Sequence, residues 1–395
     1  MAISVYPAAS SGPVYINPTS LAGSPQTATV TTSFASGYYL AYPSMQTGTN
    51  FTIGGFSKTF TAGDKLSSFL LVLPATTSSS VITTSSNGIG WLLGSTSISN
   101  SQCIVYGDKF VVGRSSGFVS YSTDGITWTS TAASQIGPNY DIKDIAYNAT
   151  PTNKYVAVGE QGGLASSTDG ITWTTRTSGF GTSLINAVAA GTTTAKYVAC
   201  GTYANGAAPI CKSSTDGITW TDRTVTSTTC NGISVVFGTV WVMTGQSGNL
   251  FTSTDAITWT SRTSGSTAGA IAVSYANNLY FTIDSVGVLR SSTDAITWTQ
   301  RATGQGNYDA GSASSYYDFI YFNSKYYRNS QAEALASSTD GITWTDPTGA
   351  GVRGLAADGT RMVTAAGRNS TTGNLVTVSD NAIALTYIGA AALGA

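Results

Sequence analysis

Most of the chain consists of short runs of apolar and β-branched residues that alternate with polar ones and are separated by turn-forming residues. Residues 185–224 show the pattern: INAVAA, KYVACG, ICKSSTDG and ITWTDRT follow one another, with Gly, Asn or Asp at the breaks. Runs of about four to seven residues rich in Val, Ile, Tyr and Thr are typical of strands. The pattern therefore predicts a meander of four strands here rather than helices.

One seven-residue phrase recurs in these units. STDGITW ends at Trp128, Trp173, Trp220 and Trp344, and STDAITW ends at Trp259 and Trp298. Successive tryptophans in this series are 45, 47, 39, 39 and 46 residues apart, which fits the period of a four-stranded propeller blade. Similar quartets of strands are expected at residues 102–130, 141–176, 231–262, 269–301, 316–346 and 353–387. The fold class predicted is all-β, a seven-bladed β-propeller.

Two weaker copies of the phrase flank the six. They are SSNGIGW, which ends at Trp91, and VSDNAIALTY at residues 378–387. We expect the propeller to occupy residues 81–395 and the strand near Trp91 to complete the last blade, because pairing the two ends of the ring removes an exposed edge. The alternative is an eight-bladed ring, in which residues 68–93 supply three strands of the extra blade.

Each residue type in the phrase has an expected structural role. The aspartate can accept hydrogen bonds from N–H groups two and three residues on, which would hold the hairpin between the third and fourth strands. The next position is Gly in four copies but Ala256 and Ala295 in two, so a positive φ is not expected to be obligatory. Alternation predicts that Ile and Trp face inward between blades. The structural residues are Asp124, Asp169, Asp216, Asp255, Asp294 and Asp340, with Trp128, Trp173, Trp220, Trp259, Trp298 and Trp344.

On these residues the phrase resembles the Asp-box, or BNR, repeat of sialidase-like and related β-propellers. The resemblance implies that the six aspartates hold turns on the face opposite the ligand face, and it says nothing about activity. Glycosidases of this kind need converging carboxylates, and sialidases carry a Phe/Tyr-Arg-Ile-Pro motif. The only glutamates are Glu160 and Glu333, and that motif is missing. A sialidase-like glycosidase is therefore the disfavoured alternative, and no catalytic residue is expected.

Composition limits the function further. Only 9% of residues are charged, the net charge is -1 and there is no histidine. A nucleic-acid partner is not expected, because no basic stripe can neutralise phosphates. The usual general base and zinc ligand are missing too, so no cofactor and no metal are expected.

The four cysteines have no CxxC spacing, which favours small buried thiols over a metal site. Cys200 and Cys211 are equidistant from Asn205-Gly206, a favoured hairpin turn. They are therefore expected to be able to face each other across a hairpin, with a disulfide as the less favoured alternative.

Candidate ligand-binding residues lie in the links between blades. The two longest links contain the same triplet, Asn139-Tyr140-Asp141 and Asn307-Tyr308-Asp309. An aromatic face beside amides and carboxylates suits a sugar, because it offers stacking and hydrogen bonds together. The alternative is that these are ordinary loop residues. The hairpins between second and third strands would add to the same face Arg114, Glu160, Gln161, Gln246, Asp284, Glu333 and Arg368.

Residues 1–80 differ from the rest. No Asp, Glu, Lys or Arg precedes Lys58, and six of the ten prolines precede residue 80. The runs TATVTTSF and SGYYLAY predict strands. An uncharged, strand-rich surface favours pairing with another chain, so this β-segment is expected to attach the protein to an assembly. The alternative is an ordinary β-domain packed on the propeller.

A Gly/Ser/Thr-rich, charge-poor chain with an N-terminal β-segment and a repetitive distal domain resembles bacteriophage tail fibres and other virion surface proteins. The resemblance implies a non-enzymatic virion structural protein that binds other virion or tail proteins through residues 1–80. Its propeller face would contact a host surface glycan or protein, outside the cell. Alternatives are a purely structural virion decoration or spacer and a bacterial adhesin, and the oligomeric state is open.

No secretion signal is visible, and the longest apolar run, residues 69–74, is far shorter than a membrane span. Membrane insertion is therefore not expected. A virion protein assembled in its host's cytoplasm needs no such signal.

Overall fold

The computed structural model describes nine strands within residues 3–93 and most of residues 101–366. The gaps in the second range lie between strands, and the longest covers residues 303–317. Every element described is a strand except two short 3-10 turns, Ser115–Gly117 and Glu160–Gly162. The predicted all-β fold is confirmed. Among the described residues, no helix is long and apolar enough to cross a membrane.

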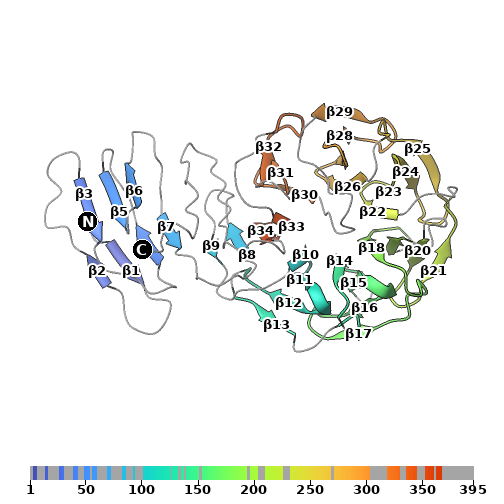
Figure 1. Ribbon diagram of the computed structural model, residues 1–395, viewed down its shortest axis with the longest axis horizontal. Coiled ribbons are helices and arrows are strands. Elements are labelled where there is room, and N and C mark those ends of the chain that lie inside the picture. Colours follow the sequence, from blue (N-terminus) through green and yellow to red (C-terminus); the bar gives the residue numbers. More distant parts are fainter. Residues whose placement is uncertain are drawn as a thin grey trace.

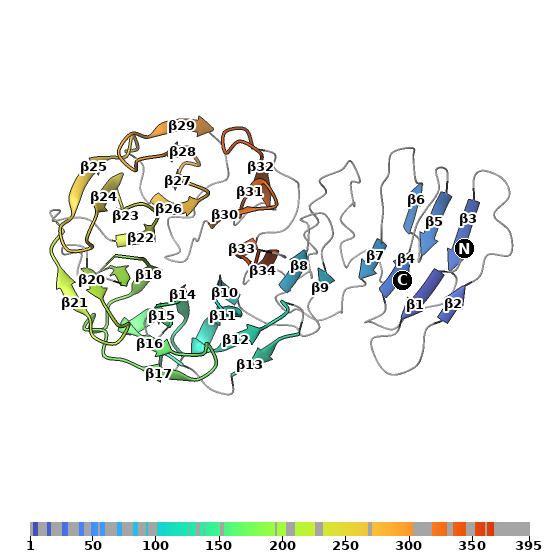
Figure 2. The same ribbon diagram turned by 180° about the vertical axis from the view of Figure 1, so that it is seen from behind.

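Residues 101–338 form six sheets around a common centre, and each sheet consists of strands that follow one another along the chain (Figure 1). The first strand of each sheet lies nearest the centre, and the last strands of the four-stranded sheets lie on the circumference, as the view from behind also shows (Figure 2). The four-stranded sheets are β10–β13 (Ser101–Tyr106, Phe110–Arg114, Val119–Ser122, Thr129–Ser130), β14–β17 (Ile142–Tyr147, Tyr155–Gly159, Leu164–Ser167, Trp173–Thr175), β18–β21 (Ile185–Ala190, Tyr197–Gly201, Ile210–Ser214, Thr221–Arg223), β22–β25 (Gly232–Phe237, Trp241–Gly245, Asn249–Ser253, Thr260–Thr263) and β26–β29 (Ile271–Ala276, Leu279–Asp284, Leu289–Ser292, Thr299–Ala302). The three-stranded sheet is β30–β32 (Phe319–Phe322, Lys325–Arg328, Ala336–Ser338).

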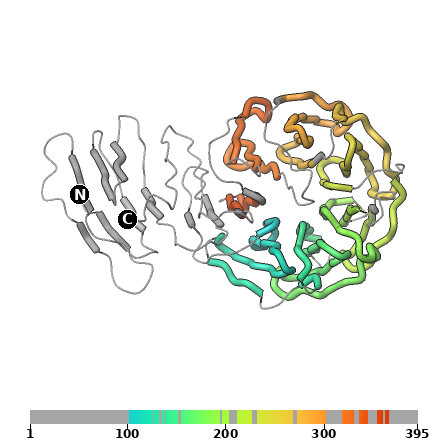
Figure 3. Tube along the Cα trace, in the orientation of Figure 1, coloured from blue at the N-terminus to red at the C-terminus, as the bar shows by residue number. Residues whose placement is uncertain are grey.

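The two ends of this array meet in a composite sheet of order β33-β34-β8-β9. Strands β33 (Val352–Ala357) and β34 (Met362–Ala366) are joined there by β8 (Ile82–Ser85) and β9 (Leu92–Leu93), which precede the first blade in the sequence. Strand β8 pairs with β34 in antiparallel register. Because β33 contacts both β30 and β10, the ring of sheets is closed (Figure 3).

This closure corrects the predicted blade count. The structure has six blades of consecutive strands where the sequence predicted seven, because β8 takes the place beside β34 that a third strand of the quartet at 353–387 would occupy. The expected pairing of the two ends of the ring is confirmed. An eighth blade from residues 68–93 is wrong, because β7 (Phe69–Val72) pairs with β4 (Tyr39–Tyr42) in a different sheet from β8 and β9.

Strands β1–β7 form two further sheets. One has the order β2-β1-β4-β7, and the other, β3-β5-β6, contains a parallel pair, β3 and β5. The run TATVTTSF overlaps β3 and the run SGYYLAY contains β4, so both predicted strands are present. The division into units 1–80 and 81–395 stays a prediction. The remaining bounds are β1 Ile3–Tyr6, β2 Val14–Ile16, β3 Gln26–Val30, β5 Thr49–Ile53 and β6 Phe56–Thr59.

The six repeat tryptophans pack between their own blade and the preceding sheet, as predicted. Trp259, for example, is 4% exposed and packs with Val198 and Cys200 of the blade before it. Trp128 of the first blade packs with Val363 of the composite sheet. The contact between a repeat tryptophan and the preceding sheet therefore also occurs where the two ends of the ring meet. The other four are Trp173, Trp220, Trp298 and Trp344.

Two cysteines face each other within one blade. Cys200 of β19 lies directly opposite Cys211 of β20 in the strand register, so the predicted placement across the hairpin is confirmed. Both side chains are buried and form no disulfide with each other, and burial raises the pKa of the Cys211 thiol to about 12. Cys230 lies outside the described residues.

The ring has two faces, which carry different connections. On the lower face lie the turns between first and second strands and between third and fourth strands; there the Lys109 ammonium donates to the carbonyl of Asp169 in the next blade, at 2.6 Å. On the upper face lie the hairpins between second and third strands and the links between blades; there the N–H of Gly162 donates to the carbonyl of Ser183, at 2.7 Å. The repeat phrase and the candidate ligand loops thus occupy opposite faces.

Candidate ligand-binding site

The six copies of the repeat phrase form turns with one shared pattern of hydrogen bonds. In the second blade, Asp169 Oδ1 accepts from the N–H groups of Ile171 and Thr172, both at 2.8 Å. The hydroxyl of Ser167 accepts from the N–H of Gly170 at 2.8 Å and donates to Asp169 Oδ1 at 2.9 Å. The aspartate bonds were predicted, whereas the part played by serine was not. Corresponding aspartate bonds occur at Asp124, Asp216, Asp255, Asp294 and Asp340.

The prediction that a positive φ is not obligatory in this turn is wrong. The residue after the aspartate has a positive φ in all six copies, including 62° at Ala256 and 59° at Ala295. An L-residue in this region costs about 1 kcal/mol or more. The Ser253 hydroxyl and the Asp255 carboxylate bind three successive N–H groups in the Ala256 copy, and these bonds hold alanine in the conformation that glycine adopts elsewhere.

The prediction that the repeat isoleucines face inward is also wrong. Ile257 and Ile296 are each 48% exposed. Their N–H groups bond to the turn aspartates, and the fourth strands begin only at Thr260 and Thr299. The isoleucine therefore belongs to the turn, where strand alternation does not apply, and only the tryptophan reaches the core.

The turn aspartates are held in their ionised form. The N–H groups of Thr297 and Ile296 lower the pKa of Asp294 to about 2. The equivalent donors Thr343 and Ile342 do the same at Asp340, whose pKa is also about 2. In each of these two carboxylates, Oδ1 accepts the hydrogen bonds that shape its own turn. This supports a structural role for the repeat aspartates.

The upper-face triplet separates into residues with different environments. Asn139 is exposed and has a φ of 61°, and half-buried Tyr140 packs against the core between the first two blades. Asp141 is 8% exposed, and its carboxylate accepts from the N–H of Ser116 at 3.0 Å and from the Lys143 ammonium at 3.3 Å. Asp141 therefore ties loops together and is not available to a ligand as Asn139 and Tyr140 are. The second triplet, Asn307, Tyr308 and Asp309, lies outside the described residues.

The other upper-face candidates are mostly committed to structure as well. Glu160 pairs with Lys143 at 2.9 Å, and Arg114 donates to the hydroxyl of Ser130 at 3.2 Å. Asp284 is 1% exposed and pairs with Arg290 at 2.8 Å. Gln161 and Gln246 are exposed, while Glu333 and Arg368 lie outside the described residues.

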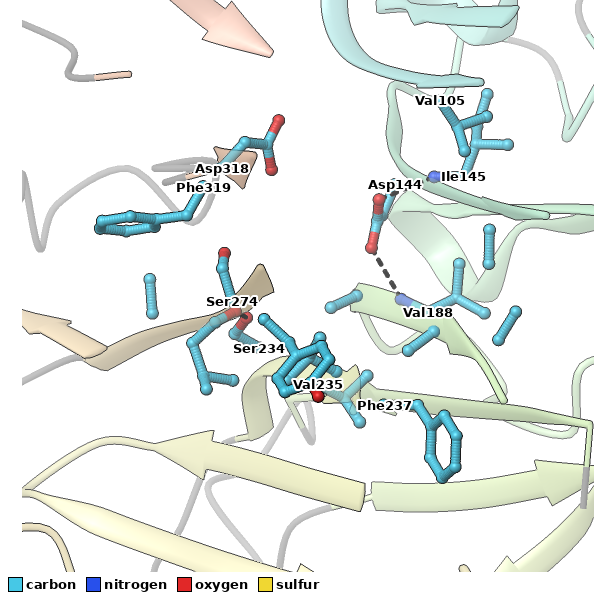
Figure 4. Close-up of a pocket in the computed structure, with 18 of the residues that line it drawn as sticks. Val105, Asp144, Ile145, Val188, Ser234, Val235, Phe237, Ser274, Asp318 and Phe319 are labelled. Carbon is cyan, nitrogen blue, oxygen red and sulfur yellow. Dashed lines mark hydrogen bonds between the residues drawn. The ribbon is translucent and has the colours of Figure 1, made fainter. Parts of the chain in front are cut away.

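A cavity of about 320 Å³ lies at the centre of the ring. All seven central strands contribute to its wall: β10, β14, β18, β22, β26, β30 with the adjoining Asp318, and β33. Much of the wall is apolar, with Val188, Val235 and Phe319 among its residues, and two carboxyl groups, Asp144 and Asp318, project into the space (Figure 4). The volume lies at the lower end of the range for small-molecule sites, roughly 300–1,000 Å³.

The two acids bridge neighbouring sheets through backbone N–H groups. Asp144 accepts from Val188 of the next blade at 2.9 Å and from Ile145 at 2.8 Å, as Figure 4 shows. Asp318 Oδ2 accepts from the N–H of Leu355 in the composite sheet at 3.0 Å. None of the ion pairs found in the described part of the chain involves either acid.

Burial among the central strands raises the pKa of both acids. The pKa of Asp144 rises to about 6, with desolvation outweighing its two N–H bonds. The pKa of Asp318 rises to about 7, first through desolvation and further through repulsion by the charge of Asp144. Near neutral pH the cavity therefore carries a partly protonated, uncompensated acid pair.

Sequence reasoning missed this pair. A usable signal was present, because Asp144 and Asp318 stand where other central strands carry Cys103, Ala187 or Ser234. An acid in an otherwise apolar or small-residue position of an inner strand is an exception that needs an explanation. Ligand residues more often lie in loops, so neither acid was predicted.

No protein-family model matches the chain, and no curated protein matches it either. Among solved structures, a streptogramin B lyase is 10% identical, with 72% of this chain and 97% of that chain covered and a TM-score of 0.52. A virginiamycin B lyase from Staphylococcus aureus is 10% identical, with 68% and 94% covered and a TM-score of 0.50. A structure described as YCF48 bound to D1 peptide is 13% identical, with 68% and 93% covered and a TM-score of 0.49. The two lyase structures support a β-propeller fold and nothing beyond the fold.

Proposed function

We propose that this protein is a non-enzymatic structural protein of a virion, in the manner of a bacteriophage tail fibre, whose upper face contacts a glycan or protein on the host surface. Residues 1–80 would attach it to other virion or tail proteins. The carrying observation is the difference between the two faces. On the lower face, the same hydrogen-bonded turn recurs from blade to blade. On the upper face, the connections differ from blade to blade in sequence.

Two finer structural assignments belong to this proposal. The hydrogen-bond pattern of the turns supports their assignment as Asp-box repeats. The contacts of β33 with β30 and β10 support assigning the composite sheet as the element that closes the ring of six blades. A rigid ring of this kind can present variable loops without changing its frame.

Binding of the full-length chain to an array of bacterial surface glycans tests the proposal. We expect binding to be lost in Tyr140→Ala and weakened in Asn139→Gly, which removes an exposed amide while allowing the positive φ. Tyr321→Ala is the matched control, since Tyr321 is a 40% exposed tyrosine in β30 beside a first-to-second-strand turn on the lower face.

Equal loss in the Tyr321 variant would contradict recognition by the upper face. If neither glycans nor host surface proteins bind, the attachment role is wrong and a purely structural decoration remains. Sugar release from any glycan on the array would instead favour the glycosidase alternative.

A further inference from the structure

We propose that the central cavity binds a small organic cation, with its ammonium or guanidinium group between the carboxyl groups of Asp144 and Asp318. The inference stands apart from attachment to a host surface, since it concerns the inner strands and not the upper-face loops. The cavity holds about 320 Å³, which is at the lower end of the range for small-molecule sites, roughly 300–1,000 Å³.

The polar groups of the cavity need a donor. Asp144 receives only backbone N–H groups, and Asp318 Oδ1 has no partner among the described residues. Asn186 lines the same cavity and is 5% exposed, and its Oδ1 is a buried acceptor with no hydrogen-bond partner. Buried acceptors of this kind are costly when unsatisfied. A cationic donor would satisfy them and neutralise the acid pair together.

The basic side chain nearest in sequence is already engaged. Lys143 precedes Asp144, but its ammonium pairs with Asp141 and Glu160 towards the upper face. The other titratable groups packed around the acids are Cys103 of β10, whose thiol pKa is raised by burial and by both aspartates, and the phenols Tyr147 and Tyr275 in the wall. None of these supplies the missing positive charge at neutral pH.

The wall favours an organic cation over a metal ion. The described residues contain no group of three or more His, Cys, Asp or Glu side chains that could hold a metal. Val105 and Val236 line the same cavity and are only half-buried, so they offer an apolar surface that suits an alkyl stem beside the charged group. A hydrated divalent cation would use the two carboxylates but gain nothing from the valines.

Binding should release protons. The free acid pair is partly protonated near neutral pH because burial raises both pKa values, to about 6 and about 7. A cation favours the ionised carboxylates and displaces those protons. Affinity is therefore expected to rise with pH between about 5.5 and about 8, while the cation keeps its charge.

Isothermal titration calorimetry of the full-length protein tests the inference. The probes are 1,4-diaminobutane and butylamine for free amines, a trilysine peptide for a protein-borne side chain, butan-1-ol as the uncharged analogue, and magnesium chloride. We expect an amine to bind and butan-1-ol not to bind. Comparison of trilysine with the free amines distinguishes a lysine side chain of a partner protein from a free amine as the ligand. Binding of either one supports the site.

The variants Asp144→Asn and Asp318→Asn should each weaken amine binding by about tenfold or more. Asp222→Asn is the matched control, because it makes the same change of charge at a carboxyl group that is 84% exposed on outer strand β21. Should an acid variant fail to fold, amine binding to the unmodified protein at about pH 5.5 and about pH 8 decides the matter instead.

The inference is overturned by any of four results. They are no binding of any amine, equal affinity for butan-1-ol, tighter binding of magnesium than of amines, or affinity that is independent of pH and of both acids.

Discussion

The protein uses aspartate in two places with opposite consequences. On the lower face, Asp294 and Asp340 sit in turns that each supply two backbone N–H groups, and both have a pKa of about 2. In the central cavity, Asp144 and Asp318 also accept N–H groups, yet burial raises their pKa values to about 6 and about 7. The balance between desolvation and hydrogen bonding decides the sign: desolvation outweighs the N–H bonds at the central acids, and the N–H bonds outweigh desolvation in these two turns. The repeated aspartates therefore stabilise the fold, whereas the unrepeated pair stores a cost that a ligand can relieve.

The largest expected effect concerns the repeat core. Trp259→Ala should lower the free energy of unfolding by about 3–5 kcal/mol, because it leaves a cavity between two blades. Tyr140→Ala, at the edge of another cluster, should lower the melting temperature much less. Thermal unfolding followed by circular dichroism measures both, and equal melting curves would contradict the assignment of the tryptophans to the core.

Next in size is a turn aspartate. Asp255→Ala removes the acceptor for the N–H groups of Ile257 and Thr258 and should cost about 1–2 kcal/mol in denaturant unfolding. Thr254→Ala changes the exposed neighbour in the same turn and should stay within about 0.5 kcal/mol. If Thr254→Ala lowered the free energy of unfolding as much as Asp255→Ala, a structural role for the turn aspartate would be contradicted.

A cavity aspartate should behave in the opposite way. The folded-state pKa of Asp318, about 7, exceeds its usual 3.8, so the folded state holds more protons than the unfolded state between these values. The contribution of Asp318 to the free energy of unfolding therefore falls as pH rises from about 4 to about 7. Asp318→Asn should raise that free energy by about 1 kcal/mol at pH 8 and flatten its pH dependence. If Asp318→Asn lowered the free energy of unfolding at pH 8 and left its pH dependence unchanged, the contrast between the cavity aspartates and the turn aspartates would be wrong.

The smallest effect is expected at the repeat isoleucine. Ile257→Ser alters a side chain that is 48% exposed and should change the free energy of unfolding by no more than about 0.5 kcal/mol. Denaturant unfolding of this variant is compared with that of Trp259→Ala, which changes another residue of the same repeat. A loss above about 2 kcal/mol would restore the inward-facing interpretation of that residue.

The sequence predicted what repetition encodes. The period between tryptophans and the strand patterns located five blades of four strands and the turns between third and fourth strands. Repetition says nothing of how a ring ends, so the composite sheet required pairing between residues far apart in the chain. The positive φ of Ala256 was not predicted from the sequence. Side-chain acceptors in the turn impose there a conformation that alanine disfavours. Each central acid departs from the small residues at the matching positions of other inner strands, but the meeting of the two acids in one cavity follows only from the fold.

Closure by β8 and β9 has a consequence for the order in which the molecule is made. During synthesis these strands emerge before every contiguous blade, while their partner β34 emerges after all six. The first blade must therefore wait with an open side until almost the whole chain is available, and the slow, non-local pairing comes last. Once made, that pairing joins both ends of the array through a contact that spans most of the sequence. Resistance to unfolding is then expected to be a matter of rate as much as of equilibrium.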